Sequence, residues 1–275
     1  MNLKEALGDK LSKDEQRKLI RSFDVIGDMA IIKIPPELED KARLIGETIL
    51  VLHKNLRVVA RQTGTCSGEY RTIPLTIIAG EDRKETIHRE YGTRMILNPE
   101  KVYFSPRLAT ERKRIADCVR DREKILVCFS GVGAFPLVIA QNSRAGKIVG
   151  IEKNSIAHEY ARKSLQLNRK ISTVTLLQGD VNDILPGLSS QYDRLLMPFP
   201  TAAHLFLPRA LPALKPGGRL HFYSFQHHDT LELAIDQLQK ECEKLKRTLI
   251  KPTLHRCGHC GTRLYRVCVD GRIDP

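Results

Sequence analysis

After Pro106 the sequence alternates between short apolar segments typical of strands and amphipathic segments typical of helices, with short connections between them. The expected strands cover residues 125–129, 147–152, 173–179, 193–197, 218–225 and 264–270. The expected helices cover residues 107–120, 155–168, 201–214 and 229–247, and a further helix follows a glycine-rich turn after the first strand. This alternation predicts an α/β fold with a mostly parallel sheet and helices on both faces. In such sheets, ligands bind beyond the carboxyl ends of the strands.

Residues 1–106 have a different pattern and predict a small α+β domain in front of the sheet. A polar helical segment over 1–22 precedes a strand pair over 23–34, and apolar residues recur at helical spacing over 37–52. Further strand signals cover 56–62, 70–79 and 84–106. The sequence therefore predicts two domains, 1–106 and 107–275.

Positive charge is concentrated in the second predicted domain. Residues 1–106 hold 18 Lys and Arg against 16 Asp and Glu, a balance of +2, so the rest of the 45 and 32 leaves 27 against 16, a balance of +11. This excess suggests a polyanionic partner, most often nucleic acid, although a basic and merely solvated surface has the same composition. With 41% hydrophobic and 28% charged residues the chain is expected to be globular, and it contains no apolar run long enough to span a membrane.

Two glycines and two carboxylates mark a candidate cofactor site. Gly131 and Gly133 lie between an apolar strand and a helix, where glycine permits a tight turn and close approach to a ligand. Glu152 ends the next strand, where a carboxylate can accept hydrogen bonds from both ribose hydroxyls, and Asp180 follows the third strand, where an adenine amino group would be read. The alternatives are a tight corner without a ligand, a helix-capping Glu152 and a surface Asp180.

The turn reads GVGAFP, so the third glycine of a dinucleotide fingerprint is missing. A glycine-rich turn with acidic residues after the second and third strands fits S-adenosylmethionine better than NAD.

Several segments together resemble the archaeal and eukaryotic tRNA (guanine-N1)-methyltransferases, which share their fold with the wybutosine-pathway aminocarboxypropyltransferases. The segments are VYFSPRLATERKRI (102–115), FSGVGAF (129–135), GIEKN (150–154), LQLN (165–168), QGDV (178–181) and GGRLHFYSF (217–225). The resemblance implies a Rossmann-like class I methyltransferase domain, S-adenosylmethionine as the cofactor, and methylation of guanosine 37 beside the anticodon. The SPR sequence at Ser105-Pro106-Arg107 favours the methyltransferase branch, because the aminocarboxypropyltransferases usually have SKG there.

The resemblance also implies the roles of individual residues. Guanine N1 carries a proton near neutral pH, so methyl transfer needs a base for that proton and a cation or donor at O6. Glu111 matches the base, Arg71 the arginine at O6, and Arg107 the arginine that orients the glutamate or the nucleotide. From the residues alone, Glu111 and Arg107 are also an i,i+4 ion pair at a helix start, and Arg71 a strand-face arginine. The expected cofactor contacts are Phe129, Ser130, Gly131, Gly133, Glu152, Lys153, Asp180, Val181 and Pro198.

Two positions depart from the family pattern. The turn after the fourth strand reads Met197-Pro198-Phe199-Pro200, with Pro198 in place of the usual asparagine, and Cys128 replaces the usual aspartate at the end of the first strand. These changes permit an altered acceptor nucleotide, a weaker enzyme or a non-catalytic tRNA-binding relative. Phe199 could still stack on a base.

The seven cysteines and the absence of an apparent signal peptide favour a reducing cytosol, and we expect a cytoplasmic monomer that binds the anticodon stem-loop of tRNA. Cys257 and Cys260 resemble half of a zinc knuckle, but a tetrahedral site needs four ligands and no second CxxC follows. We therefore predict no metal, and a turn before the last strand in this segment, with Arg256 and Arg263 near the RNA.

Overall fold

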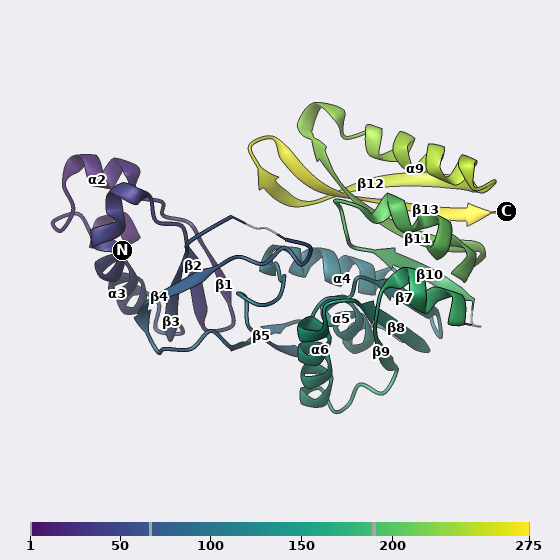
Figure 1. Ribbon diagram of the computed structural model, residues 1–275, viewed down its shortest axis with the longest axis horizontal. Helices are drawn as coiled ribbons and strands as arrows, with labels where there is room; N and C mark the ends of the chain where they lie inside the picture. Colours follow the sequence, from purple (N-terminus) through teal and green to yellow (C-terminus); the bar gives the residue numbers. More distant parts are fainter. Residues whose placement is uncertain (1, 66–67, 189–190, 275) are drawn as a thin grey trace. The chain divides into compact units, whose positions relative to one another are not determined.

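The computed structural model describes residues 2–65, 68–188 and 191–274, and its contacts divide the chain into two compact units (Figure 1). Unit 1 comprises Met1–Arg89 and Ile96–Pro106, and unit 2 comprises Glu90–Met95 and Arg107–Pro275. This division differs from the predicted ranges only in the segment Glu90–Met95. None of the helices among the described residues has both the length and the apolar character needed to cross a bilayer.

Unit 1 is built around a four-stranded sheet in the order β1-β2-β3-β4. The strands are β1 (Phe23–Ile26), β2 (Met29–Ile32), β3 (Val58–Gln62) and β4 (Leu75–Gly80). The β1–β2 hairpin turns at Gly27, whose positive φ of 60° glycine adopts without strain. The 3₁₀ helix η1 (Pro36–Lys41) leads into α3 (Ala42–Leu52), which packs on β3 and β4 through its buried Ile45 and Ile49.

The N-terminal segment differs from the single polar helix expected over 1–22. It forms two short helices, α1 (Leu3–Ala6) and α2 (Lys13–Lys18). Asn2 and Ser12 each begin a helix with a capping box, in which the cap side chain accepts from the N–H three residues on. The second cap starts a new helix where a continuous one was expected, and Leu3, Leu7, Leu11 and Leu19 bury their side chains in the core of unit 1.

Unit 2 contains a seven-stranded sheet in the order β12-β13-β11-β10-β7-β8-β9. Its strands are β7 (Lys124–Cys128), β8 (Lys147–Glu152), β9 (Val174–Gln178), β10 (Tyr192–Met197), β11 (Leu214–His227), β12 (Thr248–Gly261) and β13 (Leu264–Asp274). The strands from β11 to β9 are parallel, while β13 runs antiparallel to both β11 and β12. The predicted, mostly parallel α/β sheet is confirmed.

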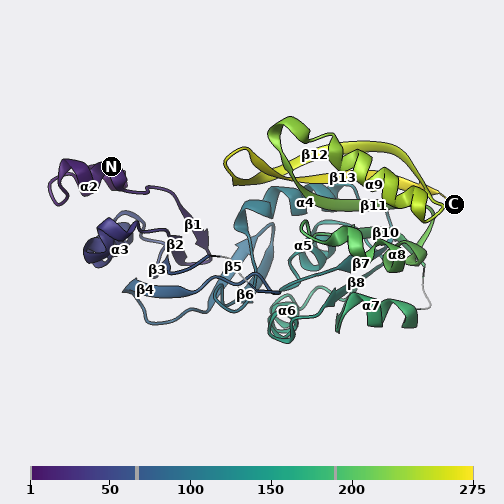
Figure 2. The ribbon, with the colours of Figure 1, turned by 45° about the horizontal axis from the view of Figure 1, so that its top comes forward.

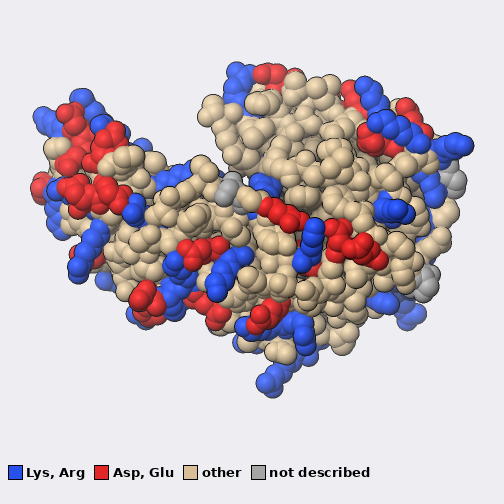
Figure 3. Space-filling view, viewed as in Figure 1, with Lys and Arg blue, Asp and Glu red and all other residues tan. Residues whose placement is uncertain are grey.

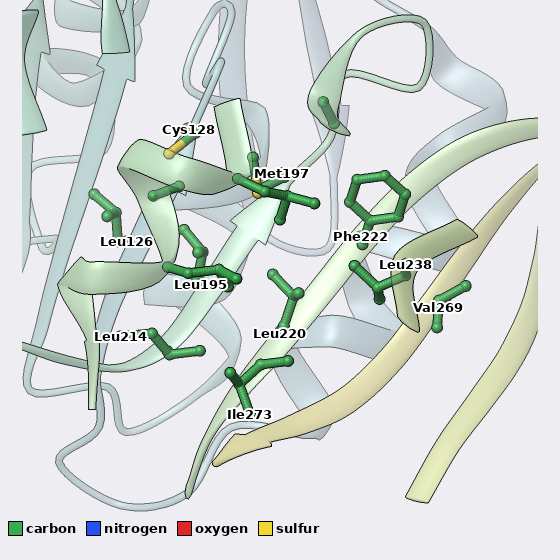
Figure 4. Packing of buried hydrophobic residues seen from close by; sticks show 14 of the residues in the cluster. Leu126, Cys128, Leu195, Met197, Leu214, Leu220, Phe222, Leu238, Val269 and Ile273 are labelled. Carbon is green, nitrogen blue, oxygen red and sulfur yellow. The ribbon is translucent and has the colours of Figure 1, made fainter. Parts of the chain in front are cut away.

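Helices cover both faces of this sheet (Figures 1 and 2). The helical segments are η2 (Pro106–Leu108), α4 (Ala109–Asp117), α5 (Ala134–Asn142), α6 (Ser155–Leu167), α7 (Val181–Ile184), η3 (Leu185–Gly187), η4 (Ala203–Phe206), α8 (Leu207–Ala210), η5 (Leu211–Ala213), η6 (His228–Thr230) and α9 (Leu233–Lys244). Residues of α4 and α5 pack on the face that carries Leu196 and Tyr223. Residues of α7, α8 and α9 pack on the other face, against Leu195, Leu220 and Phe222 (Figure 4). Alternating residues of β10 and β11 thus point to opposite faces.

Two sequence-based expectations in unit 2 were wrong. The helix expected over 201–214 is broken into η4, α8 and η5, with Pro208 and Pro212 at the first turns of α8 and η5, where the lack of an N–H costs little. Most of the segment before the last strand belongs to the 14-residue strand β12, which pairs with β13 at the edge of the sheet, and only residues 262–263 form a turn. Half of β12 is exposed, and its mixed polar sequence carries no clear alternation.

The charges visible in Figure 3 are of both signs. Lys and Arg alternate with Asp and Glu over the part of unit 1 that this face shows, and much of the visible surface of unit 2 is uncharged. The net positive charge of unit 2 is therefore not displayed as one basic patch on this face.

Strands β5 (Thr86–Glu90) and β6 (Thr93–Leu97) pair with each other, and Glu90, which belongs to unit 2, forms a buried ion pair within that unit. Glu90, at the end of β5, accepts hydrogen bonds from Nε and Nη2 of Arg112 in α4, the latter at 2.7 Å. Both side chains are almost completely buried. Because a lone buried charge is costly, the pair holds the segment Glu90–Met95 within unit 2.

We expect Glu90→Gln to lower the free energy of unfolding by about 3 kcal/mol, because it removes the carboxylate that pairs with the buried Arg112 cation. Urea denaturation measures the loss. The matched control is Glu81→Gln, which removes the partner of Arg83 from an exposed pair and should cost less than about 1 kcal/mol. Equal effects of the two substitutions would refute this role of the buried pair.

Candidate functional site

The turn after β7 has the backbone conformation that its glycines permit. Gly131 and Gly133 have φ values of +57° and +80°, and Phe129 has +59°, all in the left-handed region. The N–H of Ser130 donates to the carbonyl of Ile151 in β8 at 2.8 Å, which ties the turn to the neighbouring strand. A side chain on Gly133 would meet Cβ of Ala161 at 3.3 Å. The strained, close-packed turn brings backbone groups to the carboxyl edge of the sheet.

Glu152 lies at the end of β8 and joins the two strand ends. Its Oε2 accepts the N–H of Gly131 at 2.7 Å, and its Oε1 accepts the N–H of Asn154 at 2.8 Å. Burial raises the pKa of this carboxyl, partly offset by the backbone donors. Each carboxylate oxygen has a second lone pair, so Glu152 can still accept two hydroxyl donors. The capping alternative does not hold, because Asn154 is the N-cap of α6.

Lys153 follows the end of β8 and Asp180 follows the end of β9, and their side chains interact. Asp180 is the N-cap of α7 and accepts the N–H of Asn182 at 2.9 Å, and this bond is the main reason that its pKa is lowered. Nζ of Lys153 lies 3.2 Å from Oδ2 of Asp180. The following residue, Val181, is buried in the core. The structure thus gives Asp180 a capping role, and three-quarters of its side chain is withdrawn from solvent.

Three phenylalanines meet beyond the ends of β7 and β10. The ring of Phe129 lies 4.9 Å from the rings of both Phe199 and Phe206, measured between centroids. Pro198, between Met197 and Phe199, is half-buried, and the N–H of Phe199 bonds to the carbonyl of Met197 in a tight turn. Cys128 is fully buried, and burial raises the pKa of its thiol to about 12. The two departures from the family pattern therefore leave an aromatic, apolar surface at this edge.

These residues fit an adenosine-type cofactor. Ser130 is buried in the turn, and within the described residues its hydroxyl oxygen has no hydrogen-bond partner. An unsatisfied buried hydroxyl is costly, and a bound ligand would supply its partner. Glu152 offers acceptors for two ribose hydroxyls, and the Phe129 cluster offers an apolar surface for a planar ring.

Glu111 lies in the first turn of α4 and is buried beneath the sheet face that α4 covers. Its Oε1 accepts the hydroxyl of Tyr223 in β11 at 2.6 Å. Nε and Nη2 of Arg114 donate to Oε2 and Oε1 at 2.7 and 2.8 Å. Glu111 is therefore a buried, hydrogen-bonded carboxylate whose partner along the helix is Arg114, three residues on.

The two arginines expected near Glu111 lie in different units. Arg107, in η2 of unit 2, is exposed. Arg71, in unit 1, is not on a strand face, because β4 begins only at Leu75. It lies in the preceding turn with a φ of +54°, and its guanidinium carbon lies 5.1 Å from the ring centroid of Tyr103.

Cys257 and Cys260 lie in β12, where Cys257 is buried and Cys260 is exposed. Cys66, which a zinc site could use as a further ligand, lies outside the described residues. Across the described ranges, the only grouping of three suitable ligands is His221, Cys268 and Asp270.

The grouping of His221, Cys268 and Asp270 is part of an ionic network. Nη1 of Arg114 donates to Oδ2 of Asp270 at 2.6 Å, and His221 bonds through Nδ1 to Oδ1 of Asp270 at 2.6 Å and through Nε2 to Nη1 of Arg194 at 2.5 Å. Arg194 also pairs with Glu123 at 2.7 Å. Two guanidinium groups already occupy this cluster, which disfavours a further cation there.

Sequence reasoning missed the residues that surround Glu111. Tyr223 lies in GGRLHFYSF, a segment that contributes to the family resemblance but to no predicted role. Asp270 lies more than 150 residues from Glu111. The alternation of apolar and polar residues in 218–225 shows that His221 and Tyr223 share one sheet face. That signal alone could not identify their partner on α4.

Comparison with known proteins places both units among related sequences. The description "TRM5/TYW2 methyltransferase domain" fits residues 86–250, and "TYW2 N-terminal domain" fits residues 3–83. The chain is 41% identical to a tRNA (guanine(37)-N(1))-methyltransferase Trm5b of Pyrococcus abyssi, over 94% of this chain and 77% of that protein. It is 29% identical to a tRNA(Phe) (4-demethylwyosine(37)-C(7)) aminocarboxypropyltransferase of Methanocaldococcus jannaschii, over 92% of this chain and 98% of that protein.

Solved structures agree with these similarities. The crystal structure of Trm5b from Pyrococcus abyssi matches with a TM-score of 0.86 at 34% identity, covering 96% of this chain and 78% of that one. A complex of aTrm5 and tRNALeu matches with a TM-score of 0.85 at 31% identity, covering 100% and 78%. The expected class I methyltransferase fold is confirmed.

We expect Gly133→Ala to lower the free energy of unfolding by about 1–2 kcal/mol, because alanine at this positive φ is strained and its Cβ presses on Ala161. Thermal unfolding measures the change. The control is Gly187→Ala, where no atom of the described residues lies within 4 Å of the added Cβ and φ is not left-handed. If Gly133→Ala is as stable as the control, the turn is not constrained as described.

Proposed function

The chain belongs to the TRM5/TYW2 methyltransferase family, and from this premise we propose that it transfers a methyl group from S-adenosylmethionine to N1 of guanosine 37 in tRNA. The observation that carries the proposal is the 41% identity to a protein named for this activity, which extends over 94% of the chain and so includes both units. The similarity to the tRNA-bound structure of aTrm5 supports tRNA as the partner.

S-adenosylmethionine, when bound, supplies an electrophilic methyl group on a sulfonium. The turn from Ser130 to Gly133 would approach it with backbone groups, and Glu152 would accept its ribose hydroxyls. The remaining residues proposed to contact it are Phe129, Lys153, Asp180, Val181 and Pro198. The unpartnered hydroxyl of Ser130 and the free lone pairs of Glu152 support this assignment.

Removal of the guanine N1 proton is assigned to Glu111. The carboxylate of Glu111 is buried beside the guanidinium of Arg114 and is shielded from water, as a base in a dry site must be. Arg107, on η2 in the turn before α4, would orient Glu111 or the target nucleotide. Arg71 would donate to O6 as negative charge develops there.

A second candidate is the transfer of an aminocarboxypropyl group to a wybutosine precursor. One observation favours it: residues 3–83 match the TYW2 N-terminal domain. The Ser105-Pro106-Arg107 sequence and the higher identity to Trm5b favour methyl transfer.

Three further assignments belong to the same proposal. The enzyme acts as a cytoplasmic monomer, and it binds the anticodon stem-loop of its tRNA substrate. The excess of 11 positive charges in residues 107–275 supports binding to a polyanion, and the free cysteines support a reducing compartment.

The direct test is incubation with labelled S-adenosylmethionine and tRNA transcripts that carry each of the four bases at position 37, followed by mass analysis of the nucleosides. We expect 1-methylguanosine only from the transcript with G37. Modification of another nucleotide, or no turnover despite tRNA binding, would contradict the proposal. For the alternative, tRNA that carries the wybutosine precursor would gain an aminocarboxypropyl group instead.

We expect Glu111→Gln to lower kcat for methyl transfer by about 10²–10⁴-fold, since the amide cannot accept the N1 proton. Affinity for S-adenosylhomocysteine, measured by calorimetry, should stay within a factor of about three. The control is Glu159→Gln, which changes an exposed glutamate on α6 that pairs with Lys163. Activity of Glu111→Gln equal to that of the control would rule out Glu111 as the base.

A further inference from the structure

We propose that Tyr223 is a positioning residue for Glu111, and that Arg114, shared between Glu111 and Asp270, is the counter-charge that holds the Glu111 carboxylate in place between turnovers. The inference rests on the proposed function, in which Glu111 removes the proton from guanine N1. It adds residues of β11 and β13 to a role that the sequence motif assigns to Glu111 alone.

Tyr223 is held in place by a hydrogen bond of its hydroxyl and by the packing of its ring. It donates to Oε1 of Glu111 at 2.6 Å, a distance typical of a hydrogen bond to a charged acceptor. The Tyr223 ring packs edge-to-face on Phe135, with centroids 5.9 Å apart, and Phe135 lies two residues after Gly133. Burial raises the pKa of Tyr223 well above its usual value, so the hydroxyl keeps its proton and remains a donor. Tyr223 thereby connects the carboxylate of Glu111 to the glycine-rich turn.

Arg114 uses different edges of its guanidinium for the two carboxylates. Nε and Nη2 donate to Glu111 at 2.7 and 2.8 Å, and Nη1 donates to Asp270 at 2.6 Å, while Nη2 also makes a longer bond of 3.3 Å to Asp270. Asp270 is held in turn by Nδ1 of His221 at 2.6 Å. When Glu111 takes up a proton, Arg114 keeps Asp270 as its counter-charge. Proton uptake therefore leaves no unpaired cation in the core, which would otherwise be costly.

Further titratable groups lie around Glu111, and the buried cation of Arg266 in β13 lies close enough to act on Cys257. Cys257 of β12 and Cys268 of β13 lie near Glu111, and burial raises the pKa of both thiols. Burial lowers the pKa of His221, so this ring is an uncharged donor to Asp270. His255 of β12 lies on the far side of Asp270, with 3.4 Å between Nε2 and Oδ2. The charges that act directly on Glu111 are thus Arg114 and, beyond it, Asp270.

Two substitutions should move the pH dependence of methyl transfer in opposite directions. Tyr223→Phe removes a donor to the ionised carboxylate, so the acid limb of the kcat profile should move about one pH unit higher, with kcat lowered about tenfold and KM for tRNA unchanged. In Asp270→Asn, Arg114 forms an ion pair with Glu111 alone, and a negative charge near Glu111 is removed. The acid limb should therefore move to lower pH. General damage to the fold would not shift the limb in opposite directions.

The matched control is Tyr192→Phe, a buried tyrosine of β10 in the same sheet that packs in the cluster on the other face. Its acid limb should coincide with that of the unsubstituted enzyme. If the limb of Tyr223→Phe also coincides, the inference is wrong, even where Glu111→Gln is inactive and the base role stands. If Tyr223→Phe does not fold, Asp270→Asn decides alone: an unmoved or raised limb overturns the inference. Full activity of Glu111→Gln would instead overturn the proposed base role itself.

Discussion

The two hydrogen bonds of Glu152 hold together the edge on which the proposed chemistry depends. One carboxylate receives the N–H of Gly131 after β7 and the N–H of Asn154 after β8, so the ends of two neighbouring parallel strands are fixed to each other. The left-handed backbone conformation at Phe129 and Gly131 lets the chain reverse direction while the N–H of Gly131 stays bonded to the Glu152 carboxylate. The same group that fixes the turn therefore retains lone pairs for two hydroxyl donors at the place where ligands of parallel sheets bind.

A buried polar layer on one sheet face complements this edge. In β11, Leu220 and Phe222 join the apolar core on one side, while His221 and Tyr223 point to the side that α4 covers. On that side, acidic and basic groups alternate. Glu123 pairs with Arg194, and the neutral His221 bonds to both Arg194 and Asp270. Arg114 lies between Asp270 and Glu111 and bonds to both. Each ion has at least one oppositely charged partner, and the two carboxylates of Glu111 and Asp270 share Arg114, so the layer joins α4 to three strands through paired charges.

The α/β architecture could be predicted from local sequence signals, whereas the features that the sequence did not predict depend on long-range packing. The apolar strands from Ile125 onward and the glycine pair could be recognised because hydrophobic periodicity and the residue preferences of turns are local properties of the sequence. The strand β12 was missed because it is a half-exposed edge strand whose pairing with β13 comes from tertiary contact. Arg114 was missed as the partner of Glu111 because Arg107, four residues before Glu111, and Arg114, three residues after it, are both plausible cations. Only the buried Tyr223 and Asp270 select one geometry.

Calorimetric titration of the unsubstituted chain with S-adenosylhomocysteine tests the central claim most directly, since every proposed step depends on a nucleoside held by Glu152. We expect one site per chain and an affinity that falls at least tenfold in Glu152→Ala, because the ribose hydroxyls lose their acceptors while Asn154 still caps α6. Absence of binding by the unsubstituted chain, or undiminished affinity in Glu152→Ala, would contradict the account.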